Sequence, residues 1–283
     1  MHYSSAMDLS YGDPGRRLVR LYHEALMLQA IIVQFRLLAM LVSLEAKRRF
    51  GTGFSGIIGA FLEASMLIVI MVGMRLLTGA TAHRGMEIAP FVVSGLIVLL
   101  AFRGCLQQSM GTPQAFNRLQ SSTKITILDL DIARTIVVIL IYTFIAVVFI
   151  TILIAMGEAE PPENPLGNLW VIFLAGIFGL TVGQIIRSVL PAGFIRTILL
   201  LIFTRASIWL SGAFFVAPEL PYAWRELMLY NPLLNLTEMS RTAYFAVYTS
   251  DYADEGYVAA CLAALLITAL VVERATRSRW SEA

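Results

Sequence analysis

Long apolar runs separated by short polar connections are the main feature of this sequence. Six such runs cover about 57–77, 88–105, 132–156, 169–186, 196–217 and 257–272. A bilayer core of about 30 Å requires about 20 apolar residues in a helix, so each run predicts a membrane-spanning helix. The runs lack the two-residue alternation of barrel strands, which favours helices over a membrane β-barrel.

Composition agrees with this pattern. The chain has 283 residues, of which 58% are hydrophobic and 14% charged, against about 45–50% and about 25% in soluble domains. A water-soluble fold would leave much of that apolar surface exposed. The sequence therefore predicts an all-α integral membrane protein. A net charge of +2 and two cysteines argue against a nucleic-acid binder and a disulfide scaffold.

The distribution of cations predicts an orientation. Segments 1–56, 103–134, 187–205 and 273–283 carry 17 of the 21 Lys and Arg residues. The remaining four are Arg75, Arg84, Arg225 and Arg241. Cytoplasmic loops are enriched in cations, so both termini are expected in the cytoplasm, with an even number of spans.

The N-terminal part divides into a polar tail, 1–24, and a segment, 25–56, that leads into the first span. In the second segment Gln29, Arg36, Ser43 and Lys47 recur along one side of a helix. This pattern predicts an amphipathic helix on the membrane surface. A seventh span is the alternative, and it would disturb the distribution of cations.

The segment between the fifth and sixth spans, 218–256, is too long and too apolar for a plain connection. Its aromatic residues are Tyr222, Trp224, Tyr230, Tyr244, Phe245, Tyr248 and Tyr252. We expect external helices that dip into the membrane and return, since irregular backbone at that depth must be buried or face water. The aromatic rings fit either an interfacial belt or an exit lined for a saccharide.

Four short motifs resemble the permeases of type-2 ABC exporters of capsular polysaccharide and other surface glycans. They are Lys47-Arg48-Arg49-Phe50-Gly51 with Ser55-Gly56, Ile127-Leu128-Asp129 with Ala133-Arg134, Leu210-Ser211-Gly212-Ala213-Phe214-Phe215 with Leu220-Pro221, and Asn231-Pro232-Leu233-Leu234 with Glu238, Arg241 and Tyr244-Phe245. The resemblance runs from about 42 to 272.

The resemblance implies a six-span permease domain, 57–283, in a bacterial inner membrane. It also implies a homodimer that works with two separate ATPase subunits. The chain itself has no G-x-x-x-x-G-K-[ST] motif, so ATP and Mg²⁺ are expected on that partner and no cofactor on this chain. The expected contacts with the ATPase are Lys47, Arg48, Arg49, Phe50, Arg118 and Arg187. Whether periplasmic or outer-membrane export components attach stays open.

Ionisable residues within apolar runs are candidates for the transport path, because charge in lipid is costly. Arg205 lies about nine residues into the fifth run, with Trp209 one turn later. Arg205 either contacts an anionic substrate or pairs with a carboxylate such as Glu63. Tyr230 and Tyr244 complete the expected path.

Other charged residues are expected to be structural. Glu238 and Arg241 are spaced for an ion pair within one helix turn. Asp129 and Asp131 stand at the head of a long helix, where carboxylates cap N–H groups.

Catalytic and metal-binding motifs are missing from the sequence. His2, His23 and His83 are scattered, without metal-ligand spacing. The predicted function is a non-enzymatic permease that moves a lipid-linked polysaccharide. The alternatives are export of a small lipid or drug, and a membrane-embedded enzyme that modifies a glycan or lipid.

Overall fold

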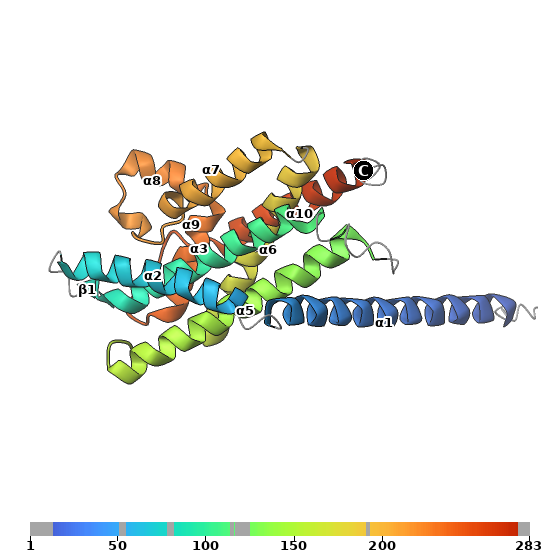
Figure 1. The fold of residues 1–283 in the computed structure, drawn as a ribbon, viewed down its shortest axis with the longest axis horizontal. Coiled ribbons are helices and arrows are strands. Elements are labelled where there is room, and N and C mark those ends of the chain that lie inside the picture. Colours follow the sequence, from blue (N-terminus) through green and yellow to red (C-terminus); the bar gives the residue numbers. More distant parts are fainter. Residues whose placement is uncertain are drawn as a thin grey trace, which may run out of the picture.

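The computed structural model describes residues 14–50, 55–77, 82–113, 116, 125–190 and 193–276. These residues form long helices and one short hairpin (Figure 1). Helices α1 (Pro14–Phe50), α2 (Ser55–Leu77) and α3 (Ile88–Met110) come first. Helices α5 (Ile127–Met156), α6 (Pro165–Val189), α7 (Phe194–Leu210) and α10 (Glu255–Thr276) form most of the rest. Between α7 and α10 lie η1 (Ala217–Glu219), α8 (Tyr222–Leu229) and α9 (Pro232–Tyr244).

Helix boundaries follow local sequence signals. Thr126 and Asp129 form a capping box at the start of α5, and Gly157 ends that helix with φ 75°. Asn164 caps α6 and Asn231 caps α9, each followed by proline at the first helical position. The strands β1 (Ala82–His83) and β2 (Met86–Glu87) join α2 to α3 through a tight turn at Arg84 and Gly85, where φ is 53° and 82°.

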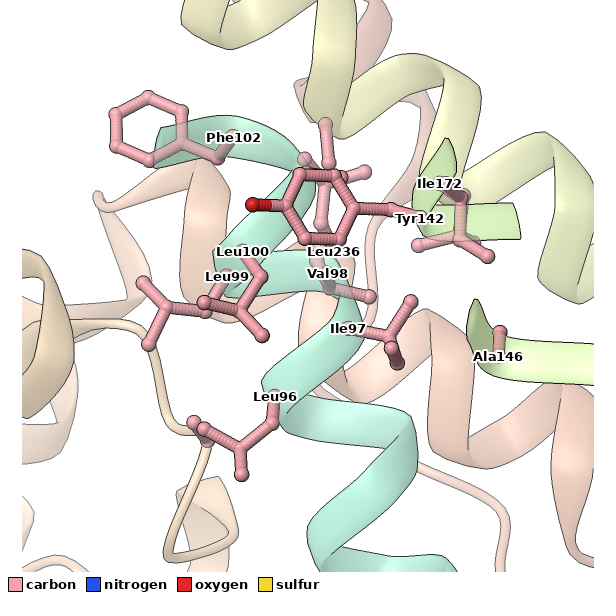
Figure 2. Close-up of a cluster of buried hydrophobic side chains, with 14 of the residues drawn as sticks. Leu96, Ile97, Val98, Leu99, Leu100, Phe102, Tyr142, Ala146, Ile172 and Leu236 are labelled. Carbon is pink, nitrogen blue, oxygen red and sulfur yellow. The ribbon is translucent and has the colours of Figure 1, made fainter. Parts of the chain in front are cut away.

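Helix α3 is the centre of the bundle. It is buried along most of its length and contacts α2, α5, α6 and α9. Figure 2 shows Leu96–Leu100 of α3 beside Tyr142 of α5, Ile172 of α6 and Leu236 of α9. Around this core, α1, α2, α7 and α10 expose many large apolar side chains. A surface of this kind is suited to lipid or to another subunit.

Helices α3 and α6 approach closely because α6 carries glycines on the contact face. A Cβ atom added at Gly179 would lie 2.1 Å from the backbone oxygen of Phe102. Gly176 and Gly183 face α3 and its neighbours at similarly short distances. Small residues at such contacts allow the close backbone packing that membrane helices use.

Five helices in the described ranges are long and apolar enough to cross a membrane. The qualifying parts are Gln29–Arg49, Ile88–Met110, Ile127–Met156, Pro165–Val189 and Glu255–Thr276. Two predicted spans are shorter than expected, since the apolar part of α2 is Ile58–Met74 and α7 has 17 residues. The all-helical membrane fold is as predicted, while the segment 25–50 also meets the length and hydropathy of a span.

The N-terminal helix differs from the prediction at its start. Helix α1 begins at Pro14, so it takes in the last part of the segment 1–24 that was expected to be a polar tail. Its C-terminal half packs on α5 and α2, and its N-terminal half projects away from the bundle (Figure 1). Gln29, Arg36, Ser43 and Lys47 are exposed, together with apolar residues such as Ile31 and Phe35.

Candidate functional site

Helix α7 presents an outward face that combines large apolar side chains with one cation. Ile198, Leu201, Arg205 and Trp209 follow one another at intervals of three or four residues and are exposed. The opposite face is polar, and its Arg196, Thr204 and Ser207 are buried. The bundle-facing side of α7 is thus the polar one, and the outward side is suited to lipid, a second subunit or a transported molecule.

Arg205 has no ion-pair or hydrogen-bond partner among the residues that the structure describes. The carboxylate proposed as its partner, Glu63 of α2, lies instead 3.8 Å from the Arg103 guanidinium of α3. Trp209, one turn beyond Arg205, is 72% exposed. Arg205 and Trp209 therefore stay available for an external ligand, whereas Glu63 connects α2 to α3.

The two tyrosines predicted for the path lie in different environments. Tyr230 is 73% exposed at the end of α8, and its backbone oxygen accepts a hydrogen bond from the Tyr257 hydroxyl. Tyr244 is buried, and its hydroxyl donates to the backbone oxygen of Glu160 at 2.8 Å. Burial, and secondarily the negative charge of Glu87, raises the pKa of Tyr244 to about 12. In this arrangement the Tyr244 hydroxyl ties α9 to the backbone before α6.

Glu238 and Arg241 of α9 form the expected ion pair, with 3.6 Å between Nη1 and Oε1, and both side chains are fully buried. The Arg241 guanidinium donates to the backbone oxygens of Gly212, Ala213 and Phe215 at 2.7–3.0 Å. It also lies 4.0 Å from the centre of the Phe91 ring. Arg241 thereby satisfies the carbonyl groups of the irregular backbone that follows α7.

The Glu238 carboxylate holds the other side of the same region. It accepts hydrogen bonds from the Ala217 backbone N–H at 3.0 Å and from the hydroxyls of Tyr248 and Ser250 at 2.5 and 2.6 Å. Burial raises the pKa of Tyr248 above its ordinary value, and the bond to Glu238 adds to this. Helix α7 ends at Leu210, where Ser211 is the C-cap and Gly212 follows with φ 71°, so the prediction that the helix continues to Ala217 is wrong.

A second buried polar cluster lies at the other end of α3. This Asp131 cluster consists of Thr112, Asp131, Arg134, Gln184, Arg187 and Glu273. Arg187 lies 2.7 Å from Asp131 and 3.4 Å from Glu273, and it donates to the Ser109 backbone oxygen at 3.0 Å. Gln184 and Thr112 also donate to Asp131. The contacts join α3, α5, α6 and α10.

The Asp131 cluster continues to α1 through Arg134. The Arg134 side chain lies 3.5 Å from Glu45, and Glu45 also pairs with Arg49 at 3.2 Å and Arg48 at 3.8 Å. Gln34 of α1 donates to Asp129 at 2.5 Å. The basic end of α1 is thus connected by charged contacts to the centre of the bundle.

These positions change the predictions for Asp131 and Arg187. Asp129 caps α5 as expected. Asp131 is not a cap but half of a buried ion pair. Arg187 is buried, so its side chain cannot dock an ATPase in this arrangement. Arg118 and the Phe50 side chain lie outside the described part of the structure.

Four members of this network were not predicted from the sequence as parts of one cluster: Glu45, Arg134, Gln184 and Glu273. The sequence does contain a signal for this cluster. Asp131 and Arg134 are three residues apart, as are Gln184 and Arg187, so each pair shares a helix face. Charged pairs on one side of an otherwise apolar helix indicate a partner within the bundle.

Proteins of known function resemble the chain over most of its length. It is 27% identical to the capsule polysaccharide export inner-membrane protein CtrC of Neisseria meningitidis serogroup B over 254 residues, 88% of this chain and 94% of CtrC. It is 23% identical to the capsule polysaccharide export inner-membrane protein BexB of Haemophilus influenzae over 244 residues, 86% of this chain and 92% of BexB. The chain is a relative of the capsule polysaccharide export inner-membrane proteins.

A third relative extends this result. The polysialic acid transport protein KpsM of Escherichia coli is 27% identical over 243 residues, 81% of this chain and 89% of KpsM. No family model matches the chain. The resemblance predicted from the four short motifs is confirmed by these matches over most of the chain.

Proposed function

We propose that this chain is the permease subunit of an ATP-driven exporter that carries a capsule-type polysaccharide across a bacterial inner membrane. The match to CtrC, BexB and KpsM over about nine-tenths of each relative supports the proposal most directly. The helical structure, with five helices in the described ranges that could cross a membrane, agrees with it.

The proposed topology has six spans, α2, α3, α5, α6, α7 and α10, with α1 along the cytoplasmic surface and both termini inside. With 17 residues, α7 is about 25 Å long. The irregular backbone after Leu210 continues towards the outer surface, and Arg241 donates hydrogen bonds to its carbonyl oxygens. Thiols introduced by Glu160→Cys and Ser278→Cys should react with impermeant reagent from opposite sides. Labelling of both from one side would refute this topology.

The proposed path lies along the outward face of α7, between two copies of the chain. A large unpartnered apolar face on α7 and another on α2 are suited to a second subunit. In such a dimer Arg205 and Trp209 from each copy would face the passing polymer. Arg205 offers a fixed positive charge for a carboxylate or lipid-linked phosphate, and Trp209 offers an aromatic face.

The proposed contact with the two ATPase subunits is the end of α1, at Lys47, Arg48 and Arg49, together with Arg118. From there the connection Arg49–Glu45–Arg134 leads to α5, and the remaining Asp131 cluster reaches α3, α6 and α10. A displacement of α1 caused by ATP binding would change these contacts first. The ATPase would then shift the balance between two arrangements of the spans.

The test is deletion of the gene for this chain in its host, followed by complementation with the intact gene. Cells without it should lose surface polysaccharide and accumulate polymer in the cytoplasm, and the intact chain should restore the surface polymer. An Arg205→Ala chain at normal abundance should restore less. Undiminished surface polysaccharide in cells without the chain would refute the proposed function.

A further inference from the structure

A groove opens where α6 and α10 begin and α9 ends. It has a volume of about 480 Å³, within the usual range of small-molecule sites. Its lining comes from the start of α6, the end of α9, the segment 245–253 and Glu255. The distribution of cations along the sequence predicts that this end of the bundle faces away from the cytoplasm. Neither α2 nor α7 contributes to the lining, so the groove is separate from the path proposed at Arg205.

The walls of the groove combine an apolar floor with polar and aromatic edges. Val171, Phe245 and Tyr248 are buried at its floor. At the edges are the exposed carboxylates Glu163 and Glu255. The charged residues that line the groove are all acidic.

Trp170 is the aromatic residue at the edge of the groove. Its indole is 54% exposed and stacks on Phe173, with ring centres 5.5 Å apart at an interplanar angle of 23°. A tryptophan at the start of a membrane helix commonly marks the lipid interface. Trp170 differs from an ordinary interfacial tryptophan because its indole borders the groove, whose lining also contains hydrogen-bonding groups.

Backbone contacts hold the groove in shape. The backbone N–H groups of Glu163 and Asn164 donate to the oxygens of Tyr244 and Ala243 at 3.1 and 2.9 Å. The Asn164 side chain accepts from the Gly167 N–H at 2.8 Å. The start of α6 is therefore fixed against the end of α9, so a ligand would meet edges that are already ordered.

We propose that this groove binds an uncharged sugar segment of the exported polymer on the outer side of the membrane. The apolar face of a pyranose ring would lie against Trp170, and its hydroxyls would donate to Glu163 and Glu255. Carboxylates at the edge repel an anionic sugar, so the site should select against sialic acid. The inference rests on the proposed function, because it assigns a site to the same substrate.

The test measures binding to the full-length chain, in complex with its ATPase subunits, in lipid nanodiscs. The probes are maltotriose, an N-acetylglucosamine trimer, a sialic acid trimer and pentalysine. At least one neutral trimer should bind saturably, and the sialic acid trimer should bind at least about tenfold more weakly. Trp170→Ala should weaken neutral binding about tenfold, at the upper end of an aromatic stacking contribution. Glu163→Gln combined with Glu255→Gln should reduce the discrimination against the sialic acid trimer.

The matched control is Trp224→Ala, since Trp224 is also exposed but lies on α8, outside the groove. This variant should bind the neutral trimer as the unaltered chain does. Three results would overturn the inference: no saturable binding of either neutral trimer, equal affinity in Trp170→Ala, or binding of pentalysine alone. If the surface polymer depends on the chain but neither neutral trimer binds, the groove assignment fails and the proposed function stands. If surface polymer persists without the chain, the proposed function itself fails.

Discussion

Replacement of Arg187 by methionine should destabilise the protein more than any exposed substitution on α7. Arg187 and Asp131 are both buried and lie 2.7 Å apart. Without the guanidinium, the Asp131 carboxylate keeps hydrogen bonds from the neutral donors Gln184 and Thr112 and the weaker attraction of Arg134. Removal of one partner from a buried ion pair costs about 3–5 kcal/mol, because the other charge stays buried without compensation.

The double variant Asp131→Asn with Arg187→Met separates this effect from a loss of packing. With both charges gone, no uncompensated carboxylate is left at position 131, and the double variant should recover most of the free energy of unfolding that Arg187→Met loses, apart from the contribution of the Arg187–Glu273 pair. Arg205→Met is the control, since Arg205 is exposed and unpaired within the described residues. It should change the free energy of unfolding by no more than about 0.5 kcal/mol.

The assay is a reversible denaturant titration of the purified chain in one detergent, with all variants compared at the same detergent concentration. The interaction energy follows from the cycle of single and double variants. If the double variant is as unstable as Arg187→Met alone, the uncompensated carboxylate is not the cause of the loss, and the reasoning about the Asp131 cluster is wrong.

Three further predictions concern α6, α9 and α7. Gly179→Ala should reduce the fraction of monodisperse protein in size-exclusion chromatography, because its Cβ would collide with the backbone of α3. Gly73→Ala, with open space around it, should leave that fraction unchanged. Equal monodisperse fractions in the two variants would refute the close contact. Tyr244 is protonated in the fold, where burial and Glu87 raise its pKa from about 10 to about 12. Its stabilising contribution is therefore present below pH 10 and lost as the pH rises towards 12, so the alkaline loss of thermal stability should be smaller in Tyr244→Phe; an unchanged pH profile would contradict this. Arg205→Ala should lower export measured as surface polymer, without lowering protein abundance, and unchanged export would remove Arg205 from the path.

The sequence was sufficient to predict the helices because long apolar runs and capping residues are local signals. The start of α6 at Asn164-Pro165 and the end of α5 at Gly157 show how directly such signals set boundaries. The end of α7 carries the same kind of signal, Gly212 with φ 71° directly after the cap Ser211, but the course of the backbone beyond it could not be read in this way. Arg241, about 30 residues further along the chain, binds the carbonyls of Gly212 and Ala213, and that contact exists only after folding.

The same limit applies to the charged residues. Arg187 follows an apolar run and looked accessible to a partner, yet Asp131 from another helix draws it into the bundle. Glu63 was a candidate partner for Arg205, but the fold places Arg103 beside it. Charge within a span can be recognised in the sequence, whereas its partner depends on how the helices pack.

Reconstituted transport tests the central claim most directly. The chain would be purified with its ATPase subunits, inserted into sealed vesicles and supplied with lipid-linked polysaccharide on the side where the ATPase is bound. Protection of polymer from an external polysaccharide-degrading enzyme should then require both ATP and this chain. Polymer that stays equally accessible to the enzyme while ATP is hydrolysed would contradict the assignment of this chain as the export permease.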